Sequence, residues 1–292
     1  MTFVLPTRIF LKGLLRFSEI NYIGKFVYMK PSILITGAYG GMGRAAAMAL
    51  SKKGYTVFAL DKNTGEASSD IIPIKADITD VEDIKHAYDQ ISSMTDKLFA
   101  IIHFAGIYML DSLVEMNNDD FEKIFRVNLR GAFLVNRTFL SLLSENSRII
   151  ITTSELAPLD PLPFTGIYAV TKAALDKYAY SLRMELQLKG IEVSVLRAGA
   201  VTTGMLGTST AALDKFCKKT ALYTCNADRF KRIVDSVESR SISPERIADK
   251  VTKILHKRRP KFSYSINRNP LLLILNILPK SYQLWIIKMI LK

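Results

Sequence analysis

The sequence predicts an α/β fold, in which a single doubly wound, parallel sheet of seven strands carries helices on both faces, a helical lid and apolar C-terminal helices. Two observations support this prediction. From residue 31 onward, short β-branched runs alternate with longer helical patterns, which is typical of βαβ units with right-handed crossovers. A glycine-rich segment at residues 37–43 joins the first apolar run to an alanine-rich helical pattern.

The elements follow one another in a regular order. The short apolar runs predict strands at residues 32–36, 56–60, 71–75, 98–102, 148–152, 192–196 and 261–266. The longer amphipathic patterns predict helices at residues 42–53, 81–93, 119–143, 166–188 and 244–256. Together they predict one catalytic domain over residues 31–266, with a nucleotide lying across the carboxyl ends of the strands.

Three segments lie outside this alternation. Residues 1–30 precede the first strand, and residues 267–292 form an apolar tail. Residues 203–243 are too long for a simple crossover, so we expect them to form a lid over the substrate.

The glycine-rich segment has the features of a phosphate-binding turn. Glycines allow a tight backbone and a close approach of phosphate oxygens to the N-terminus of the following helix. The residues expected to contact a dinucleotide here are Thr36, Gly37, Tyr39, Gly40, Gly41, Met42 and Gly43.

Asp61 ends the second predicted strand, 25 residues after Thr36. A carboxylate at this place can accept hydrogen bonds from the adenosine ribose hydroxyls and would repel a 2′-phosphate. This favours NAD over NADP, although Lys62 and Arg44 would weaken the preference. The alternative is a solvated aspartate at a strand end.

A second motif lies far downstream, where Tyr168 and Lys172 stand four residues apart and therefore on one face of a helix. Thr36-Gly37-x-x-x-Gly41-x-Gly43 with Tyr168-x-x-x-Lys172 resembles the short-chain dehydrogenase/reductase family, in its branch of roughly 250 residues. The resemblance covers about residues 31–266. It implies catalytic roles for Asn128, Ser154, Tyr168 and Lys172. It also implies further cofactor contacts from Asp77, Ile78, Phe104, Ala105, Gly106, Tyr168, Lys172, Gly199, Val201 and Thr203.

The Tyr168–Lys172 pair suits acid–base chemistry at an alcohol carbon. A free tyrosine has a pKa near ~10, and an adjacent ammonium is expected to lower it. Ser154 would hydrogen-bond the substrate oxygen. By resemblance, Asn128 would bend its helix enough to hold a water that links Lys172 to solvent. A surface Tyr–Lys pair is the alternative, and Thr153 competes with Ser154 because the spacing to Tyr168 is one residue longer than is usual in the family.

Two positions depart from the family pattern. His103 stands where the family usually has asparagine, and we expect it to be a hydrogen-bonded structural residue. Ala198 replaces the usual proline before Gly199.

Composition limits the other functional classes. The net charge of +13 comes from residues 1–30, which contribute +4, and residues 245–292, which contribute +9. A basic excess confined to the ends does not suit nucleic-acid binding. Two cysteines and three scattered histidines predict neither a disulfide framework nor a metal site, and favour a cytoplasmic protein.

The tail at residues 271–291 is apolar, but Pro279 divides it into two short predicted helices. It looks similar to the retinol- and steroid-dehydrogenase side of the family, which implies a small hydrophobic alcohol or ketone as substrate. The tail would cap the substrate pocket, pack on its own domain or a dimer partner, or contribute to peripheral contact with a membrane. The N-terminal segment is either an amphipathic membrane helix or, over residues 1–28, an extension upstream of a start at Met29.

Two rival functions share this pattern. A nucleotide-sugar epimerase or dehydratase uses the same Tyr/Lys pair, and a membrane-associated protein could bind NAD without catalysis. By family resemblance, we expect a homodimer or homotetramer formed through the helices at residues 119–143 and 166–188.

Overall fold

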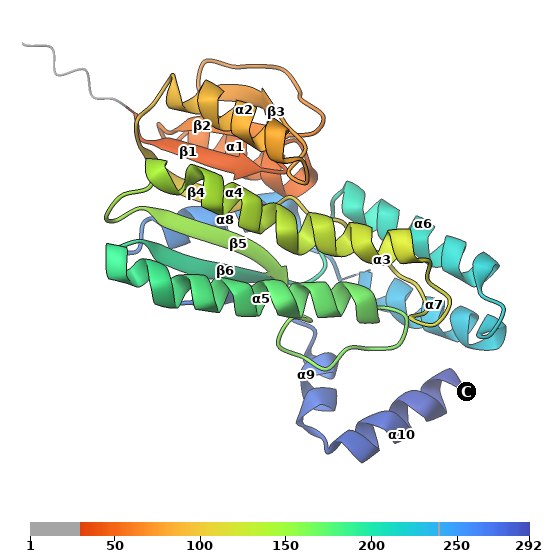
Figure 1. Ribbon diagram of the computed structural model, residues 1–292. Coiled ribbons are helices and arrows are strands. Elements are labelled where there is room, and N and C mark those ends of the chain that lie inside the picture. The colour runs from red at the N-terminus through yellow and green to blue at the C-terminus, as the bar shows by residue number, and fades with distance from the viewer. Residues whose placement is uncertain (1–29, 239) are drawn as a thin grey trace, which may run out of the picture.

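The computed structural model describes residues 30–238 and 240–292 (Figure 1). The predicted N-terminal extension, except for Lys30, lies outside the described residues. The described part contains one sheet of seven strands in the order β3-β2-β1-β4-β5-β6-β7, and every neighbouring pair is parallel. The strands are β1 Ser32–Thr36, β2 Thr56–Asp61, β3 Ile71–Lys75, β4 Leu98–His103, β5 Arg148–Ser154, β6 Glu192–Ala198 and β7 Ser263–Ile266. The predicted fold class is confirmed.

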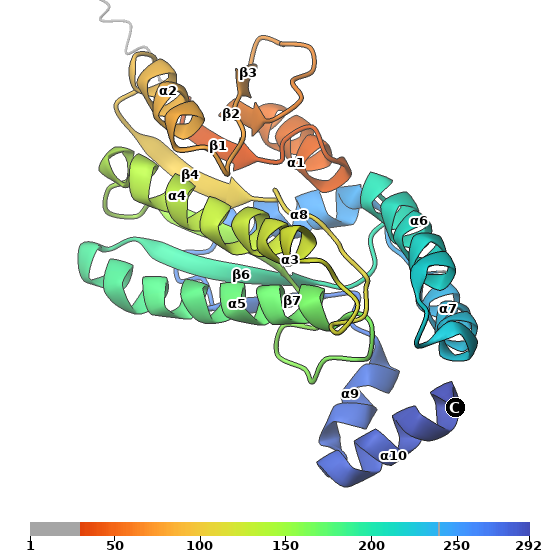
Figure 2. The same cartoon turned by 45° about the vertical axis from the view of Figure 1, so that its right-hand side comes forward.

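Helices cover both faces of the sheet (Figures 1 and 2). One face carries α2 Val81–Ser92, α4 Gly131–Thr138 and α5 Gly166–Leu186, and the other carries α1 Gly41–Ser51 and α8 Pro244–Leu255. Alternate strand residues enter the two cores: Leu34 packs under α2, α4 and α5, whereas Ile33 and Ile35 pack under α1 and α8. This period of two is what a strand buried on both faces requires.

Four strands extend beyond their predicted ends. β2 includes Asp61, β4 includes His103, β5 continues to Ser154 and β6 continues to Ala198. The ladder between β5 and β6 persists to the pair Ser154 and Ala198. The extra pairs bring Ser154 to the end of a strand rather than into a loop. β7 is shorter than predicted and begins at Ser263.

The helix predicted over residues 119–143 was wrong as a single regular element. The chain forms α3 Asn118–Phe125, a π-helical turn Arg126–Arg130, α4, and a 3-10 turn Phe139–Leu142. The π turn surrounds Asn128, whose side chain bonds to the main chain of Ile107. Widened turns of this kind occur mostly at functional sites.

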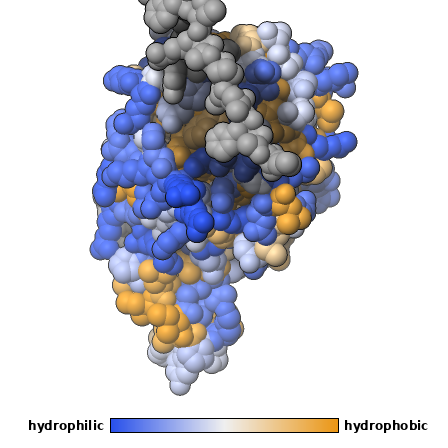
Figure 3. Space-filling view, turned by 90° about the vertical axis from the view of Figure 1, so that its left-hand side faces the viewer, coloured by the Kyte–Doolittle hydropathy of each residue, from blue (hydrophilic) through white to orange (hydrophobic). Residues whose placement is uncertain are grey.

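The segment after β6 forms α6 Gly204–Lys219 and α7 Thr224–Glu238, which lie beside the carboxyl edge of the sheet (Figure 2). The tail forms α9 Pro270–Ile277 and α10 Lys280–Leu291, separated at Pro279 as expected. Exposed hydrophobic residues gather on the tail helices, at the bottom of the view in Figure 3. Within the described ranges, no helix combines the length and apolar character needed to cross a membrane.

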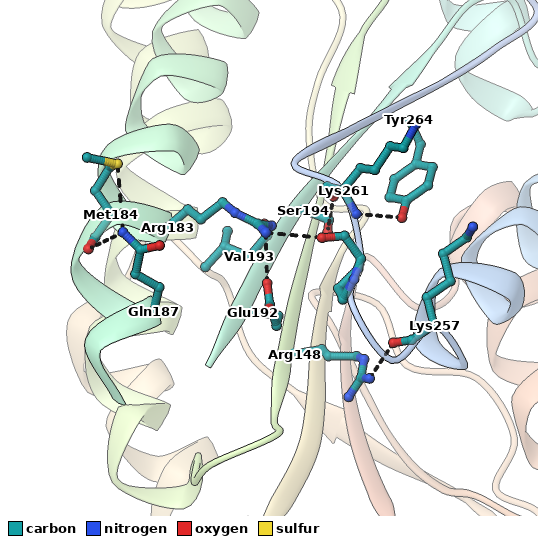
Figure 4. Close-up of polar contacts among 11 residues, drawn as sticks. Arg148, Arg183, Met184, Gln187, Glu192, Val193, Ser194, Lys257, Lys261 and Tyr264 are labelled. Carbon is teal, nitrogen blue, oxygen red and sulfur yellow. Dashed lines mark hydrogen bonds and ion pairs between the residues drawn. The ribbon is translucent and has the colours of Figure 1, made fainter. Parts of the chain in front are cut away.

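The C-terminal end of α5 is held against the sheet by hydrogen bonds from a charged side chain to main-chain carbonyls (Figure 4). Arg183 donates to the carbonyls of Val193 and Pro260 and pairs with Glu192 at 2.9 Å. On the same strand, β6, the hydroxyl of Ser194 donates to the carbonyl of Lys261. These contacts hold α5 against β6 and the chain before β7, which fixes the helix that bears the Tyr–Lys motif.

Candidate active site

The glycine turn brings two strand ends into close backbone contact. Gly37 has φ +67°, and a Cβ atom built on it would lie 2.6 Å from the nitrogen of Ala105. A Cβ atom on Gly43 would lie 2.0 Å from the oxygen of Gly37. Only glycine fits these positions, because one requires the left-handed region and both lack room for a side chain.

A hollow of about 710 Å³ opens over this turn. Thirteen of the residues expected to contact the cofactor line it: Gly37, Tyr39, Gly40, Gly41, Met42, Gly43, Asp61, Asp77, Ile78, Phe104, Ala105, Gly106 and Thr203. Thr36 instead lies buried beneath the turn, and Gly199, Val201, Tyr168 and Lys172 lie outside the lining. The lining also includes Tyr108 and Lys123, which carry no sequence motif.

Asp61 is oriented by the turn itself. Its Oδ2 accepts a hydrogen bond from the amide of Tyr39 at 3.0 Å, and its Oδ1 accepts one from Asn63 at 3.2 Å. The adjacent Lys62 forms an ion pair with Asp77 at 2.9 Å. Partial burial alone would raise the pKa of Asp77, but hydrogen bonds from Thr79 and Lys62 lower it. The ammonium of Lys62 is therefore paired with a carboxylate other than Asp61.

Tyr168 lies on the first turns of α5, two residues after Gly166. Its ring packs against Tyr108 with centroids 4.8 Å apart. Burial, followed by Tyr108, raises the pKa of Tyr168 strongly, while a hydrogen bond with Ser154 acts in the opposite direction. The expected lowering by Lys172 is thus not found in the protein alone, because desolvation of the phenolate is the larger effect.

Lys172 is buried one turn along the same helix. Its Nζ donates to the carbonyl of Thr152 at 3.3 Å and lies 5.7 Å from the ring centroid of Tyr168. Burial lowers the pKa of Lys172 to about 8. In the described part of the chain no carboxylate forms an ion pair with it.

Asn128 links the π turn to this group. Its Oδ1 accepts a hydrogen bond from the amide of Ile107 at 2.8 Å, and its Nδ2 donates to Thr171 at 3.2 Å. A Cβ atom on Gly106 would lie 3.2 Å from Asn128 Oδ1 and 3.4 Å from Lys172 Nζ, so both atoms border the same glycine. The structure therefore brings Asn128, Lys172, Tyr168 and Ser154 together.

Thr153, the competitor of Ser154, lies in a different network. Its hydroxyl donates to Asp176 at 3.3 Å, and Asp176 also accepts two hydrogen bonds from Arg197 at 3.0 and 2.7 Å. The hydroxyl of Thr153 is thus engaged with Asp176, and Ser154 is the hydroxyl residue that hydrogen-bonds Tyr168. Asp176 and Arg197 fasten α5 to β6; Asp176 was not predicted, since an aspartate in a helix has no motif value.

His103 is buried between two polar side chains. Its Nε2 lies 2.9 Å from Oδ1 of Asn136, and its Nδ1 lies 3.4 Å from the hydroxyl of Thr36. Burial lowers the pKa of His103 to about 4, so the imidazole is neutral near pH 7. It connects β1, β4 and α4, as expected of a structural histidine.

These features fit a nicotinamide dinucleotide. The glycines leave a cradle that a side chain would fill, a helix N-terminus opens at Gly41, and the carboxylate of Asp61 lies beside the turn, where it could accept bonds from ribose hydroxyls. Among the described residues, no group of three His, Cys, Asp or Glu side chains is placed to hold a metal ion.

Comparison of the sequence with known proteins identifies related oxidoreductases. The family profile described as short chain dehydrogenase matches residues 31–214. A versicolorin reductase of Emericella nidulans is 33% identical over 183 residues, which is 59% of this chain and 69% of the relative. An uncharacterized oxidoreductase of Escherichia coli is 28% identical over 245 residues, 82% of this chain and 86% of the relative.

Solved structures share the fold. A short-chain dehydrogenase family protein of Francisella tularensis has a TM-score of 0.68 at 21% identity and covers 81% of this chain and 97% of its own. The aldohexose dehydrogenase of Thermoplasma acidophilum has a TM-score of 0.68 at 19% identity, with coverage of 81% and 92%. With the profile match over most of the domain, these findings mean that the chain belongs to the short-chain dehydrogenase/reductase family of oxidoreductases.

Proposed function

We propose that this enzyme interconverts a hydrophobic secondary alcohol and its ketone, or an alcohol and its aldehyde, with NAD as the cofactor. The observation that carries the proposal is a half-buried phenol, Tyr168, hydrogen-bonded to Ser154 and adjoined by the buried ammonium of Lys172. This group borders the hollow over the glycine turn, because Tyr108 both lines that hollow and packs on Tyr168.

Each side chain has a separate task in this mechanism. Tyr168 gives its proton to the carbonyl oxygen in reduction and takes it back in oxidation. Ser154 donates a hydrogen bond to the same oxygen and stabilises the charge that develops there. A bound nicotinamide supplies or accepts the hydride. Lys172 stabilises the phenolate, and Asn128, fixed by the π turn, anchors the proton path behind Lys172.

The preference for NAD rests on Asp61. Its carboxylate is held toward the turn by the amide of Tyr39, where it can accept bonds from the ribose hydroxyls. A 2′-phosphate there would face this negative charge. Lys62 does not offset it, because its ammonium is paired with Asp77.

An apolar substrate is supported by the surroundings of the phenol. Tyr108 packs on the ring of Tyr168 and also against an apolar cluster that contains Phe164, Phe216 and Phe230. Two relatives carry related names: the versicolorin reductase, and an estradiol 17-beta-dehydrogenase of Mus musculus that is 33% identical over 190 residues, 60% of this chain and 49% of the relative.

We further infer a homodimer or homotetramer that buries the outer faces of α3, α4 and α5. These faces expose several large apolar side chains, among them Phe121, Phe133, Tyr180 and Met184.

Peripheral contact with a membrane is supported by the tail, whose charged residues are all basic and whose Ile277 is 82% exposed.

The test is a screen for NADH fluorescence with steroid, retinoid, 3-hydroxyacyl and simple secondary alcohols. We expect stoichiometric NADH formation with an apolar alcohol, and a much lower rate with NADP. Turnover that recycles the cofactor without net NADH would favour the epimerase class. A full screen without turnover would favour a non-catalytic NAD-binding protein.

A further inference from the structure

A second hollow, of about 660 Å³, lies between the tail and the body of the enzyme. We call it the tail hollow. Its walls come from four places: the loop after β4 with Leu113, the loop before α5 with Phe164, the start of α7 with Asn226, and the tail helices with Leu275, Leu284 and Ile287. Its volume lies in the range of about 300–1,000 Å³ that is typical of sites for drug-sized ligands.

The tail hollow reaches close to the catalytic group. Gly166, which begins α5 two residues before Tyr168, is part of its lining. Phe164 lines it as well and belongs to the same apolar cluster as Tyr108, which packs on the ring of Tyr168. The two hollows are therefore linked through contacts of this aromatic cluster, because Tyr108 lines the hollow over the glycine turn and Phe164 lines the tail hollow.

Phe164 has an unusual backbone at this boundary. Its φ is +64°, which is rare for a bulky residue, and its carbonyl accepts a hydrogen bond from Asp111 at 2.9 Å. Its buried ring contacts Phe216 at 4.6 Å and Phe230 at 5.3 Å between centroids. Strained residues held by their surroundings cluster at ligand sites, and Phe164 is a residue of this kind in the lining of the tail hollow.

The polar side chains at the rim already have partners. Asp160 pairs with Lys280, and its amide donates to Asn276 at 2.6 Å. Gln283 donates to the carbonyl of Leu278 at 2.8 Å, and Asn226 donates to that of Leu291 at 2.6 Å. These bonds hold α9 and α10 in place as a wall and leave an apolar lining, which suits a neutral hydrocarbon rather than a charged ligand.

We propose that the tail hollow binds the apolar body of the substrate, a neutral, elongated skeleton such as a steroid or a long alkyl chain, while its oxygen lies at Tyr168. Phe164 turns aside to let the chain pass. The inference rests on the proposed function and adds that the C-terminal tail, and not the lid alone, determines substrate length.

Leu275 and Ile274 provide a matched pair of test positions. They are neighbours on α9, but Leu275 lines the tail hollow, whereas Ile274 is 59% exposed. In the full chain, we expect kcat/KM for dodecan-2-ol to exceed that for butan-2-ol at least ~10-fold, because each buried methylene contributes about 0.8 kcal/mol. Leu275→Trp should lower this ratio about tenfold or more, and Ile274→Trp should leave it unchanged.

Leu275→Ala provides a second readout if the tryptophan disturbs folding, which thermal unfolding of both variants would reveal. It should shift the best substrate toward longer or bulkier alcohols. A chain-length profile that is the same in wild type, Leu275→Trp and Leu275→Ala would overturn the proposal while leaving the alcohol dehydrogenase function intact.

Binding of diphenylhexatriene, followed by fluorescence, separates this proposal from the function on which it rests. If no alcohol is oxidised, the proposed function fails. In that case, weaker dye binding by Leu275→Trp than by Ile274→Trp still supports an apolar site in the tail hollow. Equal dye binding by the two variants would overturn it.

Discussion

The nucleotide turn and the proton-transfer group lie at the same edge of the sheet, but different kinds of contact build them. The turn is made from consecutive residues, 36–43, whose main chain is shaped by Gly37 and Gly43. The proton-transfer group takes Ser154 from the end of β5, Tyr168 and Lys172 from α5, and Asn128 from a π turn.

This difference changes what a mutation does. A residue in the turn acts by leaving space for the phosphates, whereas Asp61, at the end of β2 beside the turn, acts through its carboxylate. Substitutions here should alter how tightly a dinucleotide binds and which dinucleotide binds. A residue in the proton-transfer group acts through a pKa that only the folded environment sets. The two functions, binding and proton transfer, should therefore be separable by substitution.

Tyr168→Phe tests the separation with the largest effect. Removal of the phenol proton should lower kcat about 10³-fold, within the usual range for a general acid–base group. The affinity for NADH, measured by fluorescence titration, should stay the same. Tyr180→Phe, on an exposed position of the same helix, is the control and should keep full activity. Full activity in Tyr168→Phe would refute the mechanism.

Asp61→Asn tests the other side of the comparison. Loss of the carboxylate should shift the ratio of kcat/KM for NAD over NADP by about 10- to 100-fold toward NADP, since hydrogen bonds to a charged group contribute about 1.5–3 kcal/mol. Steady-state kinetics with both cofactors would measure it. Asp70→Asn, whose carboxylate instead pairs with Lys30, serves as the control. An unchanged ratio would show that Asp61 does not select the cofactor.

Lys172 makes the stability of the catalytic half depend on pH. Its folded pKa of about 8 lies below its ordinary value of 10.5, so between these values the unfolded chain binds more protons than the folded chain. Burial of the Lys172 ammonium therefore lowers the free energy of unfolding by its full amount below pH 8. This destabilisation decreases as the pH rises toward 10.

Urea unfolding at several pH values would measure this effect. Lys172→Met should be more stable than the wild type at pH 7, and the gap should narrow toward pH 10, although the variant loses activity. Lys177→Met, an exposed lysine of α5, should show no such trend. A gap that is independent of pH would contradict the burial of a charged Lys172.

Asp160→Asn should have the smallest effect. It breaks the ion pair with Lys280 that joins the loop before α5 to the tail, and both side chains are partly exposed. Pairs of this kind contribute about 0.2–1 kcal/mol, and the loss should be smaller at high salt. Urea unfolding at low and high salt would detect it. A loss above about 2 kcal/mol would mean that the tail is integral to the core.

Much of the fold could be predicted because its signals are local. Alternation of β-branched runs and helical patterns placed all seven strands, and the errors were confined to their ends and to one long helix. Asn128 was found by family resemblance, but the π turn around it was not, since its shape depends on the bond between Asn128 and Ile107.

The sequence by itself determined the glycine turn and the positions of the strands along the chain, because backbone conformation at Gly37 and the period of two along a strand depend on neighbouring residues. Only the tertiary structure decided the direction in which the pKa values of the catalytic side chains shift. Burial raises the pKa of Tyr168 and lowers that of Lys172. The packing of α5 on β5 and β6 also distinguishes Thr153 from Ser154, because Thr153 donates a hydrogen bond to Asp176, which is paired with Arg197. Desolvation is set by the packing of distant segments, so no local pattern could reveal it.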